Sequence, residues 1–193
     1  MKLINVLGTG PSLKRYIGGD VETVGVNKIV MTNYVDHLLI MDRTNGFPKF
    51  VIDEIKKGKF GEFHTFLEEE WRPIVSQPMN IFEIDTLRGR ITDLDDPIMP
   101  TSLNAGYCAA ILAYKLGATI IDLYGVDFVG HATFNNPIHQ RGERGMLTDI
   151  KRDFRNLQNK LILKGASLRV TPKGLLSDFL PPIPQSRLLP DAS

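Results

Sequence analysis

The sequence predicts a single α/β domain in which helices flank a mostly parallel sheet. Apolar runs of the length of buried strands recur along the chain, and several end in a polar residue at a turn. In residues 103–128, a helix rich in small residues, a glycine stop and a β-branched strand follow in direct succession. Strands that alternate with helices in this way are typical of a parallel sheet.

The first predicted strand, residues 3–7, leads directly into Gly8-Thr9-Gly10-Pro11-Ser12. Glycine accepts positive φ angles and lets a ligand approach the backbone, and proline fixes φ. We expect Ser12 to cap a short helix and to leave backbone N–H groups free for an anion. A strand with such an end is typical of nucleotide sites in open α/β sheets, although a tight turn without a ligand fits the same pattern. No Gly-Lys-Ser/Thr follows, so a Walker-type phosphate loop is not predicted.

The second and third predicted strands also end in polar residues. Residues 21–26 lead to Asn27, and residues 37–41 lead to Asp42. Because the carboxyl ends of parallel strands share one edge of the sheet, we expect Thr9, Asn27 and Asp42 to line one crevice. Taken singly, Asn27 can be a turn former and Asp42 a helix cap or a loop ion pair. Their recurrence favours a ligand site.

The middle of the chain is the least periodic part. An amphipathic helix is predicted for residues 47–57, with Gly58 at its end. We expect residues 59–100 to form an irregular, lid-like insertion that contains short strand-like pieces at residues 63–66, 73–75 and 81–84. Asp93-Leu94-Asp95 resembles the Asp-x-Asp metal motif of many sugar transferases. Nothing places this motif at a strand end, so no metal site is predicted.

Order returns at Thr101 and Ser102, which we expect to cap a helix over residues 103–116 that Gly117 ends. The strand of residues 119–124 then runs into Gly125-Val126-Asp127-Phe128. Asp127 therefore stands at another carboxyl end. A ligand-binding role is predicted for it, with capping of the next loop as the alternative.

Residues 129–146 are predicted to form a long loop that carries His131, His139, Arg141 and Arg144. A loop of this length in a compact domain is often an active-site loop.

The last part of the chain is predicted to hold a helix, a strand and a tail. The helix begins at Leu147 and ends at Gly165, with apolar residues at spacings of three and four. Residues 167–171 form the final strand. We expect a domain of residues 1–180 and a Pro-rich tail or interaction arm of residues 181–193.

The composition excludes several classes of protein. A formal net charge of +1 gives no general attraction to nucleic acid or to an anionic membrane. The single cysteine, Cys108, excludes an intramolecular disulfide. No apolar run approaches the ~20 residues of a transmembrane segment, and no signal-peptide pattern is present. We therefore expect a cytoplasmic protein. Membrane-surface contact through the basic, apolar tail stays open, as does a homo-oligomer.

In these motifs the chain resembles the bacterial family-42 glycosyltransferases, which are sialyltransferases that use CMP-sialic acid. It also resembles related proteins with a 6-hydroxymethylpterin diphosphokinase-like domain. The resemblance implies a Rossmann-like domain and covers most of the chain. The matching pieces are Gly8-Thr9-Gly10-Pro11-Ser12-Leu13-Lys14, Asn27, Thr101-Ser102, Gly117, Gly125-Val126-Asp127-Phe128, Thr148-Asp149-Ile150 and residues 171–182.

The resemblance implies a nucleotide site and a metal-independent reaction without a cofactor. The general base of the family is a histidine in the loop before the Thr-Asp-Ile helix, and His139 lies in that loop here. His131 is the alternative base. Together with the strand-end residues above, the predicted nucleotide contacts are Gly8, Thr9, Gly10, Pro11, Ser12, Asn27, Asp42, Thr101, Ser102, Gly125, Asp127 and Phe128.

The resulting hypothesis is inverting transfer of a sugar from a nucleotide-activated donor, with a CMP-sugar as the first choice. His139 would deprotonate a hydroxyl of a glycan or other acceptor, and Arg141 or Arg144 would offset charge on the departing phosphate. One alternative is ATP-dependent pyrophosphoryl transfer to a pterin-like alcohol, with Mg²⁺ between Asp42 and Asp127. Another is a nucleotide-binding protein without catalytic activity.

Overall fold

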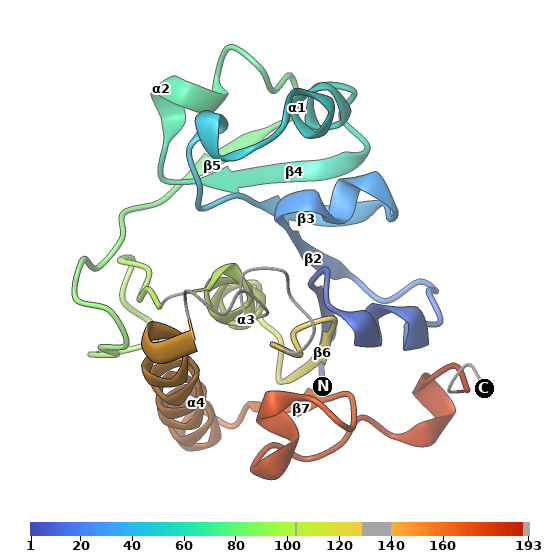
Figure 1. Cartoon of the computed structure of the whole chain (residues 1–193), viewed down its shortest axis with the longest axis vertical. Helices are drawn as coiled ribbons and strands as arrows, with labels where there is room; N and C mark the ends of the chain where they lie inside the picture. Colours follow the sequence, from blue (N-terminus) through green and yellow to red (C-terminus); the bar gives the residue numbers. More distant parts are fainter. Residues whose placement is uncertain (103, 129–139, 191–193) are drawn as a thin grey trace.

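The computed structural model describes residues 1–102, 104–128 and 140–190, and for residues 140–146 it describes the backbone only. Its strands form one parallel sheet in the order β5-β4-β3-β2-β1-β6-β7, shown in Figure 1. This confirms the predicted α/β class. The strands are β1 (Leu3–Leu7), β2 (Thr23–Val26), β3 (Val35–Leu39), β4 (Phe60–Thr65), β5 (Met79–Ile81), β6 (Ile120–Tyr124) and β7 (Ser167–Val170).

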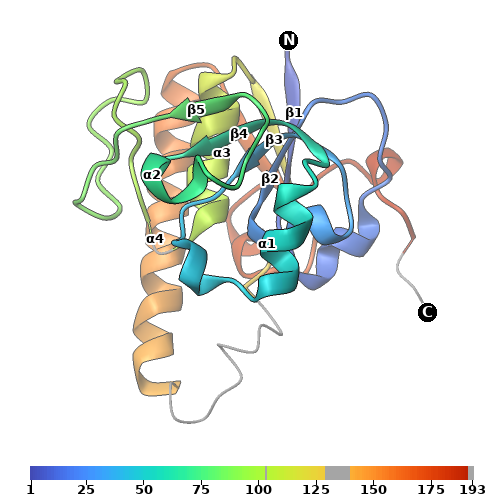
Figure 2. The same cartoon turned by 90° about the horizontal axis from the view of Figure 1, so that it is seen from above.

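Helices cover both faces of this sheet. Figure 2 shows α3 and α4 on one side and α1 on the other. The α-helices are α1 (Lys49–Lys56), α2 (Glu68–Trp71), α3 (Ala105–Lys115) and α4 (Gln140–Leu163). Short 3₁₀ helices are η1 (Pro11–Arg15), η2 (Asn27–Met31), η3 (Thr44–Gly46), η4 (Leu175–Asp178) and η5 (Gln185–Arg187). None of the helices in the described ranges is both long and apolar enough to cross a bilayer.

The strand order reverses at β1. From β1 the chain proceeds outward through β2, β3, β4 and β5, and it then returns to the other side of β1 to form β6 and β7. Leu7 is in register with Tyr124 of β6 and with Gly25 of β2, so these strand ends are level. Open α/β sheets bind ligands at the carboxyl ends of the strands where the strand order reverses, which here is between β1 and β6.

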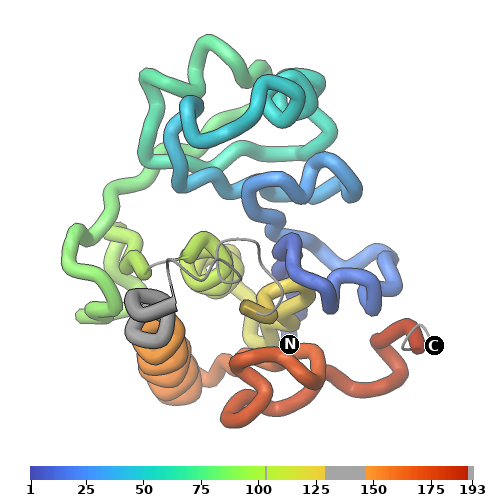
Figure 3. The backbone as a smooth tube through the Cα atoms, in the orientation of Figure 1, coloured from blue at the N-terminus to red at the C-terminus, as the bar shows by residue number. Residues whose placement is uncertain are grey.

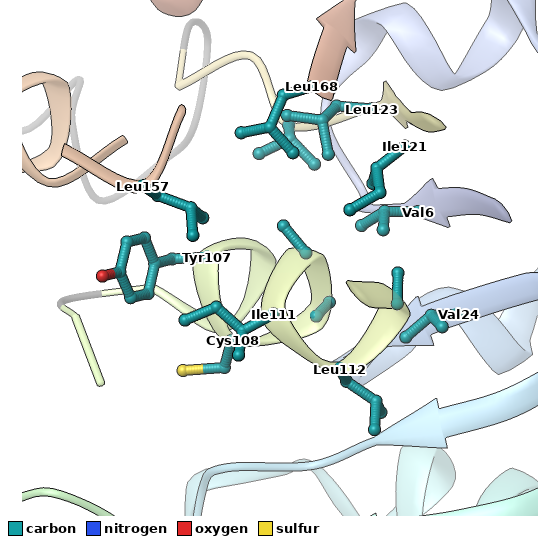
Figure 4. Packing of buried hydrophobic residues seen from close by; sticks show 14 of the residues in the cluster. Val6, Val24, Tyr107, Cys108, Ile111, Leu112, Ile121, Leu123, Leu157 and Leu168 are labelled. Atoms are coloured by element: carbon teal, nitrogen blue, oxygen red, sulfur yellow. The ribbon is translucent and has the colours of Figure 1, made fainter. Parts of the chain in front are cut away.

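The larger core forms around α3. Its residues from Gly106 to Ala113 are all buried, and their small side chains let the helix pack closely on the sheet. Figure 4 shows α3 beside Val6, Val24 and Ile121 of the central strands, with Leu112 next to Val24, and all of these residues belong to one hydrophobic cluster. The predicted apolar stripe of α4 is buried in the same cluster, from Ile150 through Phe154 and Leu157 to Leu161. This packing fixes the start of α3 against the sheet edge.

The prediction of an irregular insertion is wrong for the first part of residues 59–100. That part contains β4, α2 and β5, which complete the sheet. The strand-like pieces expected at residues 63–66 and 81–84 overlap β4 and β5, but Glu62 and His64 on one face of β4 interrupt its apolar pattern. From residue 82 to residue 100, pairing is limited to an isolated bridge between Ile84 and Met99.

The prediction of a free tail is wrong for residues 181–190. Ile183 and Leu188 are buried in the second hydrophobic cluster. Arg187 donates to Asp122 of β6 over 3.0 Å and to Asn5 of β1 over 3.1 Å. Figure 3 follows this segment from β7 back to the region of η1. Periodicity could not show this, because the anchors join residues that are far apart in the sequence.

The last long helix begins earlier than predicted. α4 starts at Gln140 rather than Leu147, so the final residues of the predicted loop 129–146 are helical. Gly142 and Gly145 interrupt the helical pattern of the sequence there. Residues 129–139, with His131 and His139, lie outside the described residues.

Candidate functional site

The turn after β1 and the loop after β6 interlock through their backbones. The N–H of Gly8 donates to the carbonyl of Tyr124, and the N–H of Gly10 donates to that of Gly125, each over 2.8 Å. A Cβ on Gly8 would lie 2.4 Å from the Gly125 oxygen, and one on Gly10 would lie 2.7 Å from Asp127 Oδ2. The glycines are therefore required for contact between the two loops.

Asp127 ties these loops to the end of β7. Its side chain accepts from the Ser12 N–H over 2.6 Å, from the Ser12 hydroxyl, and from Thr171 Oγ1 over 3.4 Å. The Ser12 oxygen in turn accepts from the N–H of Gly125 over 2.9 Å and from the Thr171 hydroxyl over 2.7 Å. Asp127 is 2% exposed. Its carboxylate is thus bound by protein groups at the point where the strand order reverses.

Two expectations for the turn after β1 are wrong. Gly10, not Ser12, occupies the N-cap position of η1, and no side chain caps this helix. The N–H groups of Gly8, Gly10 and Ser12 donate to protein acceptors instead of being free for an anion. Thr9 and Pro11 are exposed at the tip of the turn. A ligand that binds at this edge of the sheet would therefore contact Thr9 and Pro11 at the tip of the turn.

Two asparagines at this edge of the sheet carry buried atoms that no described residue partners. Asn27 follows β2 with a φ of 51°, a left-handed conformation that asparagine tolerates. Its Oδ1 is buried and has no hydrogen-bond partner within the described ranges. Asn104 caps α3 by accepting from the Tyr107 N–H over 2.8 Å, and its Nδ2 is similarly buried without a described partner. An unsatisfied buried polar group costs about 1–3 kcal/mol, so these atoms mark places that a ligand can complete.

The first turn of α3 belongs to this edge. A Cβ on Gly106 would lie 2.9 Å from Val126 Cγ1, so the start of the helix contacts the loop after β6. The amino end of a helix carries partial positive charge and suits an anion. We call the turn of residues 8–12, Asn27 at the end of β2, the loop of residues 125–128 and residues 104–107 the switch-point edge.

Thr101 and Ser102 bind protein groups rather than capping α3, whose N-cap is Asn104. The Thr101 hydroxyl donates to the Asp85 carbonyl over 2.7 Å, which holds the segment of residues 82–100. The Ser102 hydroxyl donates to Asp153 Oδ2 over 2.7 Å. The prediction that Thr101 and Ser102 cap α3 is therefore wrong. Asparagine is among the best N-cap residues, because its side-chain oxygen accepts from the first turn.

Asp153 is a buried carboxylate of α4 that the sequence prediction missed. It is 1% exposed and lies 3.1 Å from the Arg152 guanidinium as well as near Ser102. Burial raises the pKa of the Tyr107 hydroxyl, and the charge of Asp153 raises it further. The Tyr107 oxygen is a third buried atom for which the described residues supply no partner. A signal for Asp153 existed, since it stands beside Phe154 at the border of the apolar stripe.

Thr171 was also left out of the predicted site. It directly follows β7 and is completely buried. The signal was the same as for Thr9, Asn27 and Asp42, a polar residue at the end of an apolar run.

Asp42 lies apart from the switch-point edge. It is exposed, and its carbonyl accepts from the indole N–H of Trp71 over 3.2 Å. Since β3 is three strands away from β6, at about 4.8 Å per strand, the two strand ends are about 14 Å apart. Asp42 and Asp127 are thus not brought together.

The remaining predicted residues extend along the edge or beyond the described side chains. Phe128 has a φ of 56° and packs on Phe154, with 6.0 Å between the ring centroids. Arg141 and Arg144 lie in the first turns of α4, where only the backbone is described. His139 lies outside the described residues.

The Asp-x-Asp motif binds a lysine. Lys164 Nζ lies 2.8 Å from Asp93 Oδ1 and 2.5 Å from Asp95 Oδ2. These hydrogen bonds to Lys164 hold the pKa of both carboxyls below the usual range. Asp95 and Lys164 also line a cavity of about 300 Å³ near the amino ends of β6 and β7. This is the opposite end of the strands from the switch-point edge.

No family model and no curated protein sequence matches the chain. Solved structures do match it. The sialyltransferase CstII from Campylobacter jejuni in complex with the substrate analogue CMP-3FNeuAc has a TM-score of 0.59 at 14% identity, covering 98% of this chain and 89% of that chain.

Two further structures agree. CST-II in complex with a trisaccharide acceptor and CMP has a TM-score of 0.61 at 12% identity, covering 96% of this chain and 88% of that one. The alpha-2,3-sialyltransferase from Campylobacter jejuni in its apo form has a TM-score of 0.55 at 12% identity, covering 97% and 82%. The chain therefore has the fold of these sialyltransferases over nearly its whole length, as the sequence resemblance predicted.

Proposed function

We propose that the protein binds a CMP-activated sugar at the switch-point edge and transfers the sugar to an acceptor hydroxyl. The observation that carries the proposal is a pair of buried atoms, Asn27 Oδ1 and Asn104 Nδ2, that have no partner among the described residues and lie at the edge where the strand order reverses. Structures with the same fold contain CMP or CMP-3FNeuAc.

The two asparagines offer complementary groups to a nucleotide. Asn27 Oδ1 can accept from a cytosine amine or a ribose hydroxyl, and Asn104 Nδ2 can donate to a phosphate oxygen. The amino end of α3 adds favourable charge for that phosphate. In this proposal Asp127 and Ser12 are positioning residues, because their polar groups hold the two loops together.

The proposed reaction is a single displacement. The acceptor oxygen forms a bond to the anomeric carbon while the bond from that carbon to the phosphate oxygen breaks, and CMP leaves with the electron pair. The imidazole of His139 takes the acceptor proton, which suits a group whose ordinary pKa is ~6.5. Arg141 or Arg144 offsets charge on the departing phosphate. The assignments of His139, Arg141 and Arg144 rest on the sequence, and His131 is the rival base.

The geometry disfavours the pyrophosphokinase alternative. That reaction needs Mg²⁺, which binds carboxylate oxygens at about 2.1 Å. The strand ends before Asp42 and Asp127 are about 14 Å apart, and Asp127 is already bound by Ser12 and Thr171. The proposed sugar transfer uses no bound metal, so EDTA is expected to leave it unchanged.

Thermal-shift titrations with CMP, UDP, GDP and ATP, with and without Mg²⁺, test the nucleotide. CMP at 100 times its Kd should stabilise the protein by about 2.7 kcal/mol, a rise in Tm of roughly 5–10 °C. If only the combination of ATP and Mg²⁺ stabilised the protein, the result would favour the pyrophosphokinase. No stabilisation by any of the nucleotides would contradict the proposed nucleotide site.

Turnover of a CMP-sugar tests the base. Replacing His139 by Ala should lower kcat by about 100-fold or more, whereas His131→Ala serves as the matched control and should retain activity. If His131→Ala lowered kcat and His139→Ala did not, His131 would be the general base. CMP binding without any turnover of a donor would leave a nucleotide-binding protein that lacks catalysis.

A further inference from the structure

Three side chains of β3 and β4 meet on one face of the sheet. The register places His37 beside Glu62, and His64 lies two residues further along the same face of β4. His37 Nδ1 lies 3.1 Å from His64 Nε2 and 3.5 Å from Glu62 Oε2, and the remaining distance, from His64 Nε2 to Glu62 Oε2, is 3.7 Å. We call these three residues the histidine cluster.

The triangle has the dimensions of a metal site. Zn²⁺ binds imidazole nitrogen and carboxylate oxygen at about 2.1 Å, so two ligand atoms of a tetrahedral site lie about 3.4 Å apart. The three measured distances bracket this value. Within the described part of the chain, this is the group of His, Cys, Asp and Glu side chains that could hold a metal. We propose that the histidine cluster binds a divalent transition-metal ion, with Zn²⁺ as the first choice. The three side chains leave one coordination position of the ion open.

Neighbouring side chains orient the ligands. His37 Nε2 is 2.9 Å from Glu22 Oε1, which directs Nδ1 of the same ring toward Glu62 and His64. Lys2 Nζ holds the other oxygen of Glu22 at 2.7 Å. Metal-binding histidines commonly have their second nitrogen bound to a carboxylate in this way. Asn80 of β5 likewise donates to Glu62 Oε2 over 2.8 Å.

Burial and exposure are also suited to a bound cation. His37 and His64 are 8% and 4% exposed, whereas the Glu62 side chain is 45% exposed. A metal can therefore enter beside Glu62 and keep a water as its fourth ligand.

The proposal is independent of the nucleotide site. His37 and Glu62 lie within their strands, and Glu22 directly precedes β2, at the amino end of the sheet. The switch-point edge lies at the carboxyl ends of β1 and β6. Loss of metal binding is therefore expected to leave CMP binding intact, and each proposal can fail alone.

Calorimetric titration of the metal-free full-length protein with ZnCl₂ tests the site. We expect one Zn²⁺ per chain, and titration with Co²⁺ should give the strong visible absorption of a four-coordinate ion. His37→Gln and His64→Gln should each weaken Zn²⁺ binding by about 100-fold or more, and Glu22→Gln by about tenfold through the orientation of His37.

The control is the double variant His131→Gln/His139→Gln, which removes the other two of the four histidines and should retain the wild-type affinity for Zn²⁺. If the His64 variant does not fold, Glu62→Gln replaces it, since this exposed side chain can change without loss of the core. Absence of a 1:1 complex in the wild type would overturn the proposal. So would binding that survives His37→Gln but is lost in the double variant.

Discussion

The switch-point edge and the histidine cluster both bury polar side chains, but they differ in how these groups are satisfied. At the edge, Asn27 Oδ1 and Asn104 Nδ2 have no partner in the described residues, while Asp127 is fully engaged by Ser12 and Thr171. In the cluster, the facing atoms of His37, Glu62 and His64 lie close to one another, and Glu22 anchors the outer nitrogen of His37.

This difference indicates two kinds of ligand. An unpartnered acceptor and an unpartnered donor on separate elements fit a large organic molecule that supplies both complementary groups, such as a nucleotide. Three donor atoms at a common separation fit a single cation. The engaged carboxylate of Asp127 shows that a polar residue at a strand end can serve the scaffold rather than the ligand.

The largest expected effect tests whether the interlocked loops are the scaffold of the edge. Gly125 has a φ of +67°, and a Cβ there would lie 2.4 Å from the Gly8 carbonyl oxygen, whereas Gly165 has a φ of +75° with open space around it. Gly125→Ala should lower the free energy of unfolding by about 4 kcal/mol, from backbone strain plus the clash. Gly165→Ala should cost about 1 kcal/mol from strain alone. Urea denaturation measures the free energy of unfolding of both variants. Equal losses would show that the close contact between the two loops does not add to stability.

The next effect concerns the histidine cluster and pH. His64 titrates near pH 6.5 when unfolded, and its folded pKa is about 4, mainly because the imidazole is buried. Between these values the unfolded chain binds the extra proton, so this contribution to stability is present above pH 6.5 and is lost as the pH falls toward 4. From pH 7 to pH 5 the loss should be about 2 kcal/mol.

His64→Gln removes that titration and is the control. Its free energy of unfolding, measured by urea denaturation in the absence of metal, should change less between pH 7 and pH 5 than that of the wild type, by about 2 kcal/mol. The same slope in both proteins would show that other groups cause the acid sensitivity and that folding does not lower the pKa of His64.

The smallest effect distinguishes a ligand-binding asparagine from a surface one. Asn27→Gly keeps the left-handed backbone and removes the unpartnered oxygen, so CMP should bind about tenfold more weakly while stability without ligand is retained. Asn45→Gly alters an exposed asparagine in η3 and should leave the Kd for CMP unchanged. Calorimetry with CMP measures both variants. Equal affinities would remove Asn27 from the site.

Much of the fold could be predicted because its signals are local. The strand ends at Thr9, Asn27 and Asp127 followed from apolar runs that stop at a polar residue, and the stripe of α4 followed from helical spacing. Only part of β4 gave such a signal, as the strand-like piece of residues 63–66, because Glu62 and His64 interrupt its apolar pattern. The docking of residues 181–190 was hidden because the bonds of Arg187 to Asp122 and Asn5 depend on distant parts of the chain.

The site was less predictable than the fold for the same reason. A sequence shows that Ser12 and Asp127 stand at strand ends, but not that they bind each other. The histidine cluster depends on the pairing of β3 with β4, which places residues 37 and 62 side by side. The proximity of His37 and His64 emerges only from the register of these two strands.

Hydrogen exchange measured with and without CMP locates the nucleotide site on the chain. We expect CMP to slow amide exchange in peptides that cover residues 8–12, 27–31, 104–107 and 125–128, while those that cover β3 and β4 are unchanged. Zn²⁺ should slow amide exchange in the peptides that cover β3 and β4 and leave the other four segments unchanged. Protection by CMP confined to β3 and β4, or none at saturating CMP, would contradict a nucleotide site at the edge between β1 and β6.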